Sequence, residues 1–210
     1  MLLEIVPEAI LQRCIKISDE APQDLKSNLR RAYSKFTPED IELCTKQKEY
    51  KGILFALCWF HSLIVGRRRF GPPGYSKSYP FNDGDLTICA QVLFQYLDTN
   101  PTVPWEDLRY IFGEIMYGGH IINDFDRLMT MTYLAWFMKD DLLEETELYP
   151  FNEGENQSFK TCMPTTYEKY LVHIDDNMGV DTPVAFGLHT NAEIDFRTTQ
   201  AKTLFHTLAE

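Results

Sequence analysis

Apolar residues recur at every third or fourth position along most of the chain, and this spacing predicts helices. Residues 7–13 begin the series, and only residues 14–18 alternate in the manner of a short strand. The next helical face consists of Leu25, Leu29, Ala32 and Phe36. The pattern predicts a mainly α fold, a multi-helix array with at most one short strand near the N-terminus.

One segment is apolar on nearly every side. Residues 53–65 include one histidine and one serine among large hydrophobic residues, which predicts a central, buried helix. Arg67, Arg68 and Arg69 follow it, at the end where the helix dipole favours cations. Residues 71–74, with the sequence GPPG, then stop the helix. We call these four residues the elbow.

Polar capping residues and prolines mark the starts of the other helices. Thr37, followed by Pro38, Glu39 and Asp40, is one strong start. Three later helices are predicted. The first starts at Asp83 or Asp85 and has the apolar face Leu86, Cys89, Leu93 and Leu97; the second lies between Pro104 and Gly118-Gly119 and has the face Trp105, Leu108, Phe112 and Ile115. The third starts at Asn123 or Asp124 and has the face Leu128, Met131, Ala135 and Met138. Residues 140–163 are acidic and irregular, and two last helices are expected, from Thr165 or Thr166 to about Asn177 and from Thr198 to Ala209.

Charge and cysteine usage narrow the class of protein. The formal net charge is −11, from 31 acidic and 20 basic residues, which argues against nucleic acid or an anionic membrane as the main partner. The five cysteines are scattered and form no C-x-x-C pair, as is typical of a reduced intracellular setting. The N-terminus lacks a basic signal region, and residues 53–65 are too short to span a membrane. We expect a soluble, cytoplasmic protein.

The glycine spacing around the arginines is similar to that of a phosphate-binding loop, which requires backbone N–H donors followed by a lysine and a hydroxyl. Pro72 and Pro73 follow Gly71 and have no N–H to donate. A buried helix, rather than a strand, precedes Gly66. The sequence therefore favours a helix stop and a rigid elbow over a nucleotide site, and no cofactor-binding residue is assigned.

No other motif predicts catalysis or metal binding. The five histidines show no metal-ligand spacing, and His61 is expected to be a hydrogen-bonded core residue. Asp124 and Asp126 are candidates for a carboxylate pair, but two acids in the first turn of a helix, next to Arg127, are more often a cap and a salt bridge. A small hydrolase that uses these aspartates or a cysteine stays a minor alternative. No catalytic or metal residue is assigned.

The three arginines allow a different function. Such a run is usually a solvated helix end, yet it is the only dense positive patch in an acidic chain. A free-standing helical adaptor that binds an acidic protein through Arg67, Arg68 and Arg69 is therefore the second hypothesis.

Three long stretches resemble the dynein heavy chain family: FHSLIVGRRRFGPPGYSKSYPFNDGDL (60–86), VPWEDLRYIFGEIMYGGHIINDFDRL (103–128) and FGLHTNAEI (186–194). Their order and spacing are similar to those in the C-terminal part of the motor ring, and IKISDEAPQDLKSNLRRAY (15–33) resembles the entry to the lid of the sixth AAA+ module. The segment FNDGDLTICA is more similar to the corresponding sequence of axonemal outer-arm chains of the alpha type than to that of cytoplasmic chains.

The resemblance implies a lid fragment of an ATP-driven microtubule motor of cilia and flagella. It implies that residues 1–34 end the large subdomain of the sixth module, 35–195 form the helical lid, and 196–210 begin the connection to the C-terminal domain. ATP and Mg²⁺ would be bound by other modules. The implied partners are the neighbouring AAA+ modules, the C-terminal domain, microtubules, and dynein intermediate and light chains, with no nucleic acid or membrane.

The implied role is mechanical: the lid relays conformational change within the ring. The structural candidates for contacts between modules are Arg67, Arg68, Arg69, Gly71, Pro72, Gly118, Gly119, Asp124, Asp126 and Arg127. The chain begins inside an apolar helical pattern without a cap, which we interpret as a boundary within a longer protein. The implied location is the cytoplasm and cytoskeleton, in the axoneme of a cilium or flagellum.

Overall fold

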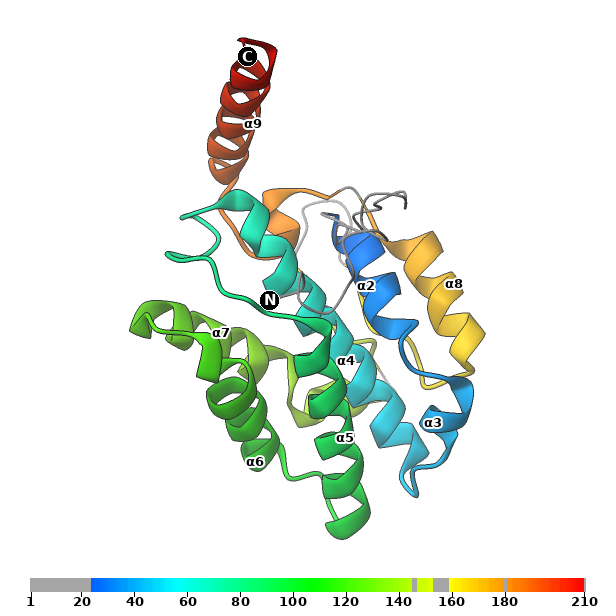
Figure 1. Ribbon diagram of the computed structural model, residues 1–210. Coiled ribbons are helices and arrows are strands. Elements are labelled where there is room, and N and C mark those ends of the chain that lie inside the picture. Colours follow the sequence, from blue (N-terminus) through cyan, green and yellow to red (C-terminus); the bar gives the residue numbers. More distant parts are fainter. Residues whose placement is uncertain (1–23, 145–146, 153–158, 180, 210) are drawn as a thin grey trace, which may run out of the picture.

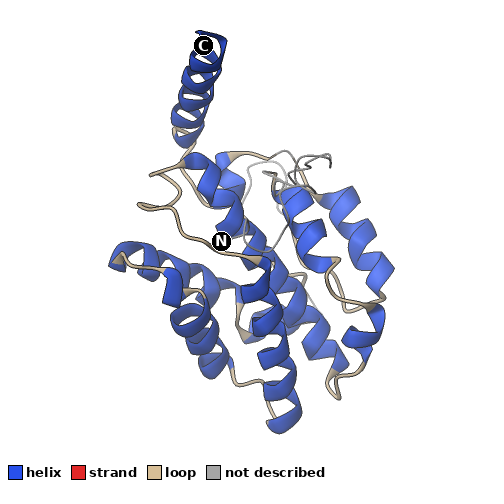
Figure 2. Ribbon diagram, in the orientation of Figure 1, coloured by secondary structure: helices blue, strands red, loops and turns tan. Residues whose placement is uncertain are grey.

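The computed structural model describes residues 24–144, 147–152, 159–179 and 181–209 (Figure 1). These residues form eight α helices joined by loops and short turns of tighter or wider helix. Figure 2 shows helices and loops but no strand in the described part of the chain. The mainly α prediction is therefore confirmed. The helix expected at 7–13 and the strand expected at 14–18 lie outside the described residues.

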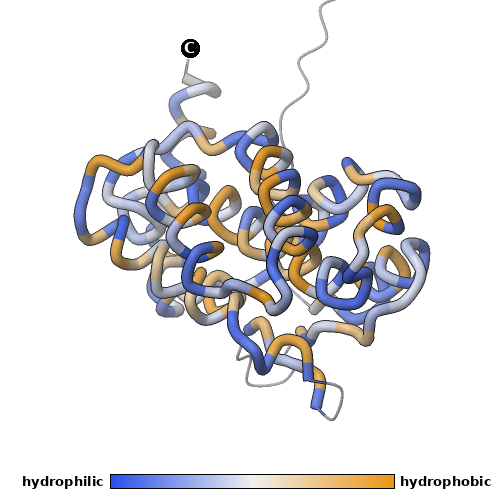
Figure 3. Tube along the Cα trace, turned by 90° about the horizontal axis from the view of Figure 1, so that it is seen from below, coloured by the Kyte–Doolittle hydropathy of each residue, from blue (hydrophilic) through white to orange (hydrophobic). Residues whose placement is uncertain are grey.

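Helix α4 (Gln47–Gly66) is the centre of the body, as its apolar sequence predicts. Its residues 52–64 are all buried. Helices α2 (Leu25–Tyr33), α5 (Asp83–Thr99) and α7 (Asp124–Phe137) pack against α4, and α8 (Tyr167–Asn177) covers α2 (Figure 1). Figure 3 shows the hydrophobic residues gathered in the inner helix turns. Burial of apolar surface around α4 is therefore the main source of stability.

Local capping explains where two helices begin. Thr37 and Asp40 form a capping box at the start of α3 (Pro38–Glu42), which confirms the predicted start, although this helix is only 5 residues long. Asn82 and Asp85 form a second capping box at the start of α5. The predicted apolar face of α5 is confirmed, because Leu86, Cys89, Leu93 and Leu97 are all buried.

A wide helical turn changes the expected face after α6 (Trp105–Tyr110). The chain continues as a π-helical turn, η3 (Ile111–Met116), in which the Tyr117 N–H donates to the Phe112 carbonyl oxygen at 2.9 Å. A π turn holds more residues than an α turn, so the α-helical spacing no longer predicts which side chains face inward. Phe112 is buried as predicted, but Ile115 is 53% exposed, and its assignment to the core face was wrong.

The expected face of α7 was also wrong. Leu128 and Ala135 are exposed, whereas the buried residues of the helix are Asp126, Thr130, Leu134 and Phe137. The hydrophobic spacing failed because two of these four residues are polar and hydrogen-bonded in the interior. Met138, just after the helix, is buried as expected.

Part of the segment predicted to be acidic and irregular belongs to the core. Tyr149, Phe151 and Phe159 are buried, and the rings of Phe151 and Phe159 stack on Trp59 at centroid distances of 5.4 and 5.1 Å. Pro150 and Lys160 form an isolated antiparallel bridge that joins the segment of Tyr149 and Phe151 to the segment of Phe159. The acidic composition of residues 140–163 gave no indication that aromatic side chains of this segment pack on α4.

The two last helices differ in how well they were predicted. Helix α8 begins after Thr166 and ends at Asn177, as expected. Helix α9 (Ala192–Ala209) begins 6 residues before the predicted Thr198. It projects from the body at the top of Figure 1, and most of its residues are exposed.

Candidate functional site

The three arginines lie in a short 3₁₀ helix, η2 (Arg67–Phe70), which extends α4. Arg67 is 2% exposed, so it is not a solvated helix end. Its guanidinium donates to the carbonyl oxygens of Gly74 at 3.1 Å and Phe186 at 2.5 Å, and to the Tyr133 hydroxyl at 2.9 Å. Arg67 therefore connects α4, the elbow, α7 and the turn η6 (Pro183–Phe186). We call Arg67 and these partners the arginine hub.

The charge of Arg67 is balanced by dipoles and rings. The guanidinium carbon lies 5.1 Å from the ring centroid of Tyr133 and 5.7 Å from that of Tyr75. Within the part of the chain that the structure describes, no carboxylate forms an ion pair with it. A buried cation is costly unless its donors are satisfied, so the hub holds these four segments in one arrangement.

The neighbouring arginines have different surroundings. Arg68 is exposed and donates to the Phe81 carbonyl oxygen at 3.2 Å. Arg69 pairs with Asp181 at 2.6 Å, and its guanidinium lies 4.7 Å from the ring centroid of Phe186 and 5.4 Å from that of Phe196. The three residues do not form one exposed positive patch, so the surface that the adaptor hypothesis requires is absent. This part of the hypothesis was wrong because the run continues into the core.

The elbow is a tight turn that is closed by hydrogen bonds between backbone groups. Gly71 has a φ of +63°, a conformation that favours glycine, and the N–H groups of Gly74 and Tyr75 both donate to the Gly71 carbonyl oxygen, at 2.8 and 3.0 Å. Pro72 is exposed at the tip of the turn. Since these N–H groups are already satisfied within the turn, the geometry favours a helix stop over a phosphate cradle.

The two aspartates at the start of α7 do not face one another. Asn123 caps the helix, Asp124 is exposed, and Asp126 is buried. Asp126 accepts hydrogen bonds from the Tyr79 hydroxyl at 2.7 Å and from the Ser76 N–H at 3.1 Å. Burial alone raises the pKa of Asp126, but the hydrogen bonds from Ser76 and Tyr79 outweigh it and leave the pKa below its usual value. The arrangement anchors a loop and does not build a two-carboxylate centre.

Arg127 holds the corner between η3 and α7. It pairs with Glu114 at 2.9 Å and donates to the Ile121 carbonyl oxygen at 2.8 Å. A Cβ atom on Gly118 would lie 2.3 Å from the Gly113 carbonyl oxygen, so the close approach of these two segments requires glycine at that position. A Cβ atom on Gly119 would meet nothing within 4 Å.

A second buried polar group connects α4 to the start of α5. His61, expected to be a core histidine, is 4% exposed, and its Nδ1 lies 3.0 Å from the Tyr117 hydroxyl, which confirms the prediction. Its Nε2 lies 3.7 Å from Asp83, which also pairs with Lys35 at 2.7 Å. The nearby His61 ring, together with Lys35, holds the pKa of Asp83 well below its usual range.

Sequence reasoning missed the partners of the arginines. Tyr133 and Phe186 lie 66 and 119 positions from Arg67 along the chain, and Asp181 lies 112 positions from Arg69. No local pattern connects such distant residues. The only available signal was the density of charge at the end of an apolar helix.

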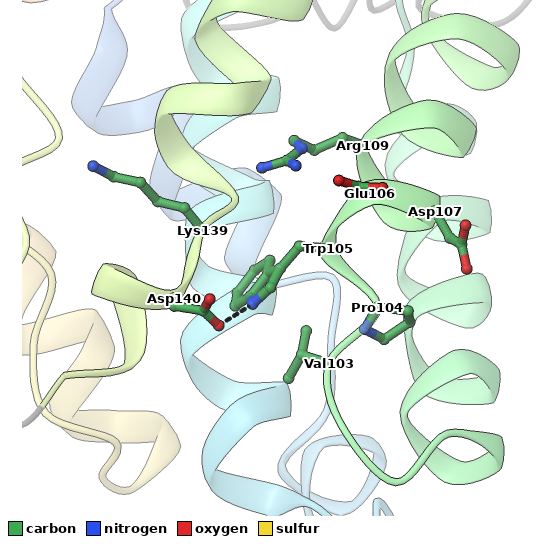
Figure 4. A pocket seen from close by; sticks show the side chains of 8 residues that line it. All are labelled: Val103, Pro104, Trp105, Glu106, Asp107, Arg109, Lys139 and Asp140. Carbon is green, nitrogen blue, oxygen red and sulfur yellow. Dashed lines mark hydrogen bonds between the residues drawn. The ribbon is translucent and has the colours of Figure 1, made fainter.

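One open pocket lies beside the first turn of α6 (Figure 4). It has a volume of about 460 Å³ and is lined by Val103, Pro104, Trp105, Glu106, Asp107, Arg109, Lys139 and Asp140. Figure 4 shows the Trp105 indole directed at Asp140, to which its N–H donates. Arg109 donates to the Met138 carbonyl oxygen at 3.1 Å, and Lys139 pairs with Asp141 at 2.7 Å. Both basic side chains of the pocket therefore already bind groups of this chain, and the pocket lining contains acidic as well as basic residues.

The described residues contain neither a metal-binding group nor a membrane-spanning helix. No group of three or more His, Cys, Asp or Glu side chains among them is placed to hold a metal ion. None of the described helices combines the length and apolar character that crossing a membrane would require. Burial disfavours the thiolate and raises the pKa of the Cys58 and Cys89 thiols well above the usual value, as expected for packing residues.

The helical body, its internal arginine hub and the self-contained elbow define a mainly α packing domain. The family model described as "Dynein heavy chain AAA lid domain" matches residues 50–192. The chain belongs to the dynein heavy chain family. The division at residues 34 and 195 stays a prediction.

The relatives are axonemal or flagellar heavy chains. Dynein axonemal heavy chain 17 is 47% identical over 207 residues in Mus musculus and 46% identical over 206 residues in Homo sapiens, and each match covers 98% of this chain. The dynein alpha chain of the flagellar outer arm of Chlamydomonas reinhardtii is 40% identical over 224 residues, so the similarity includes the alpha type named above. The chain spans only 4 to 5% of the length of these relatives.

Proposed function

We propose that the chain is the lid of an axonemal dynein heavy chain and acts as a rigid block that relays conformational change between neighbouring AAA+ modules. The parent protein would be an ATP-driven microtubule motor in the axoneme of a cilium or flagellum. Its partners would be the modules beside the lid, the C-terminal domain, microtubules, and the intermediate and light chains. Family membership and the names of the relatives support this assignment.

The arginine hub is the observation that carries the mechanical part of the proposal. A relay requires that a push on one face arrives at another without being absorbed between them. Arg67 connects the end of the central helix to three segments that approach it from different parts of the chain. Since interiors are close-packed, such a body moves as one piece.

In this proposal the lid itself holds no cofactor. ATP and Mg²⁺ are bound by other modules of the parent, and the role of residues 67–74 is structural. The structural role of residues 67–74 is supported by the N–H groups of Gly74 and Tyr75, which already donate to the Gly71 carbonyl oxygen. A hydrolase that uses Asp124 and Asp126 receives no support, since the two side chains lie in different environments.

Microtubule gliding by the full-length heavy chain tests the relay. We expect Arg67→Met to slow gliding severalfold, because a loosened hub lets the lid deform instead of moving as a block. The matched control is Arg68→Met, which removes an exposed neighbouring guanidinium and is expected to leave the velocity unchanged. Equal velocities for wild type and Arg67→Met, with a lid shown by calorimetry to be destabilised, would refute the mechanical role.

A further inference from the structure

Helix α9 presents an apolar face along its length. Residues 197–208 are all exposed, and Ile194, Leu204, Phe205 and Leu208 are 65, 59, 70 and 74% exposed. These residues and Ala201 recur at intervals of three, four and seven positions, which return to the same side of an α helix. They therefore form one surface on one helix. We call it the α9 stripe: Ile194, Ala201, Leu204, Phe205 and Leu208.

The stripe faces away from the body of the lid. The opposite side of α9 holds Ala192, which is 5% exposed, and Phe196, whose ring centroid lies 5.6 Å from that of Phe70. The Arg69 guanidinium lies 5.4 Å from the same Phe196 ring. Two residues of an α helix advance by about 200°, so Ile194 and Phe196 point in nearly opposite directions. Beyond this base α9 projects from the body (Figure 1), and the described part of the lid leaves the stripe uncovered.

The outer part of α9 requires a partner if it is to be a stable helix. An isolated helix shorter than about 12 to 15 residues is marginal in water, and packing of an amphipathic face supplies most of the stability of helices in proteins. Residues 197–208 are a segment of this length with every position exposed. In stable domains an apolar stripe of a helix is buried against another element. The stripe is therefore a contact surface.

The chemistry of the stripe selects an apolar partner. All five members of the stripe are uncharged. Among the described residues of α9, the charged residue on the same side is Arg197, which pairs with Glu193 at 2.7 Å within the helix. The surface thus offers large apolar side chains and no unpaired charge. A segment that presents apolar residues at a matching spacing complements it.

The family match indicates which polypeptide supplies that segment. The matched lid domain ends at residue 192, which is the first residue of α9. The heavy-chain relatives match 98% of this chain, so their similarity continues through most of α9, and this chain spans only 4% of their length. Helix α9 therefore lies beyond the lid domain but within the heavy-chain sequence. Since consecutive elements are usually adjacent in space, the polypeptide that follows α9 is the partner.

We propose that the α9 stripe packs on an apolar segment of the heavy chain that follows residue 210. This inference rests on the proposed function, because it takes the chain to be part of a longer heavy chain. Helix α9 is then held at its base by Phe70 and Arg69, next to the arginine hub, and along its stripe by the following polypeptide. A movement of that polypeptide thus reaches the end of α4 through one helix.

Photo-crosslinking in the full-length heavy chain tests this contact. A benzoyl-phenylalanine at position 205 replaces a phenylalanine that is 70% exposed, so the probe leaves the core of the lid untouched. We expect irradiation to join position 205 to a peptide that follows residue 210 in the same heavy chain, as identified by mass spectrometry. The matched control carries the probe at Thr203, an exposed residue on the other side of α9, and is expected to give at least about fivefold less of this product.

A charge within the stripe sharpens the test. Leu208→Lys places an ammonium group in the proposed apolar contact and is expected to lower the crosslinking yield from position 205 at least about fivefold. Thr203→Lys adds the same charge on the other side of the helix and is expected to leave the yield unchanged. Because all three positions are exposed, none of these changes disturbs the interior of the lid.

Four outcomes would overturn the proposal: no product from position 205, equal yields from positions 203 and 205, a product with a peptide that precedes residue 192, or a product with a second polypeptide, including a second heavy chain. The gliding assay on Arg67→Met is independent of these results. Slowed gliding without the crosslink would remove the α9 contact and leave the relay standing, whereas unchanged gliding with the crosslink would do the reverse.

Discussion

The arginine hub and helix α9 lie next to each other and are built on opposite principles. The hub buries a charged residue and satisfies it with carbonyl oxygens, a hydroxyl and aromatic rings. Helix α9 begins on the aromatic surface of Phe70, which Phe196 contacts at a centroid distance of 5.6 Å. Apart from that anchor it exposes large apolar side chains: Ile194, Leu204, Phe205 and Leu208.

The contrast shows that apolar character alone does not locate the core. The most apolar turns of α9 are exposed, whereas a cationic residue is among the most buried of the molecule. Packing decides burial: Arg67 lies where several segments meet at the end of α4, whereas most of α9 projects from the body. Four substitutions test this contrast, and their expected effects on stability decrease in the order given.

Arg67→Met in the 210-residue chain is expected to lower the free energy of unfolding by about 3 kcal/mol, because the carbonyl oxygens of Gly74 and Phe186 lose their buried donor. Urea denaturation measures the change. Arg68→Met is the matched control, with an expected change within about 0.5 kcal/mol. Similar losses for the two variants would show that burial of Arg67 contributes little.

Gly74→Ala is expected to cost about 2 kcal/mol, because the added Cβ atom would lie 2.0 Å from the Arg67 carbonyl oxygen and the backbone must shift. Gly119→Ala provides the comparison, since a Cβ atom there meets nothing within 4 Å. Thermal unfolding of both variants measures the difference. An unchanged midpoint for Gly74→Ala would mean that the elbow is not packed against η2 as described.

Asp126→Asn is expected to cost about 1.5 kcal/mol at neutral pH, since the charged acceptor of Tyr79 and Ser76 becomes neutral. The pKa of Asp126 is lowered in the folded state, so its contribution is present above the unfolded value of about 3.9 and is lost as the pH falls below that value.

Urea titrations at a series of pH values measure this dependence. The stability difference between wild type and Asp126→Asn should shrink as the solution is acidified. Asp124→Asn, at an exposed position of the same helix, should track the wild type at every pH. A difference for Asp126→Asn that stays constant with pH would contradict the assignment of the charge to the Tyr79 and Ser76 bonds.

Phe205→Ser is expected to change the free energy of unfolding by no more than about 0.5 kcal/mol, because this side chain is 70% exposed. Circular dichroism during urea denaturation is a sufficient measurement. A loss above about 1 kcal/mol would show that α9 packs on the body and would remove the contrast with the hub.

Local chemistry explains what the sequence alone could predict. The caps at Thr37 and Asn82 and the continuous apolar run of α4 act within a few residues, so helix starts and the central helix could be located. The candidate site was less accessible. Arg67, Asp126 and Arg127 were selected because of their charge, but their roles depend on partners that the chain brings from elsewhere.

Three failures have one physical cause. The face of α7, the outward turn of Ile115 and the aromatic cover from residues 149–159 all depend on tertiary contacts that override a regular hydrophobic period. A buried aspartate cannot be distinguished in the sequence from an exposed one. A π turn has no characteristic hydrophobic spacing by which the sequence could reveal it.

If the lid moves as one rigid block, amide hydrogen exchange of its core in the full-length heavy chain should not depend on the nucleotide state. We expect equal protection of α4, the elbow and the first turns of α7 with and without bound nucleotide. Nucleotide-dependent exchange in α4 or the elbow would show that the body deforms internally, and would contradict the claim.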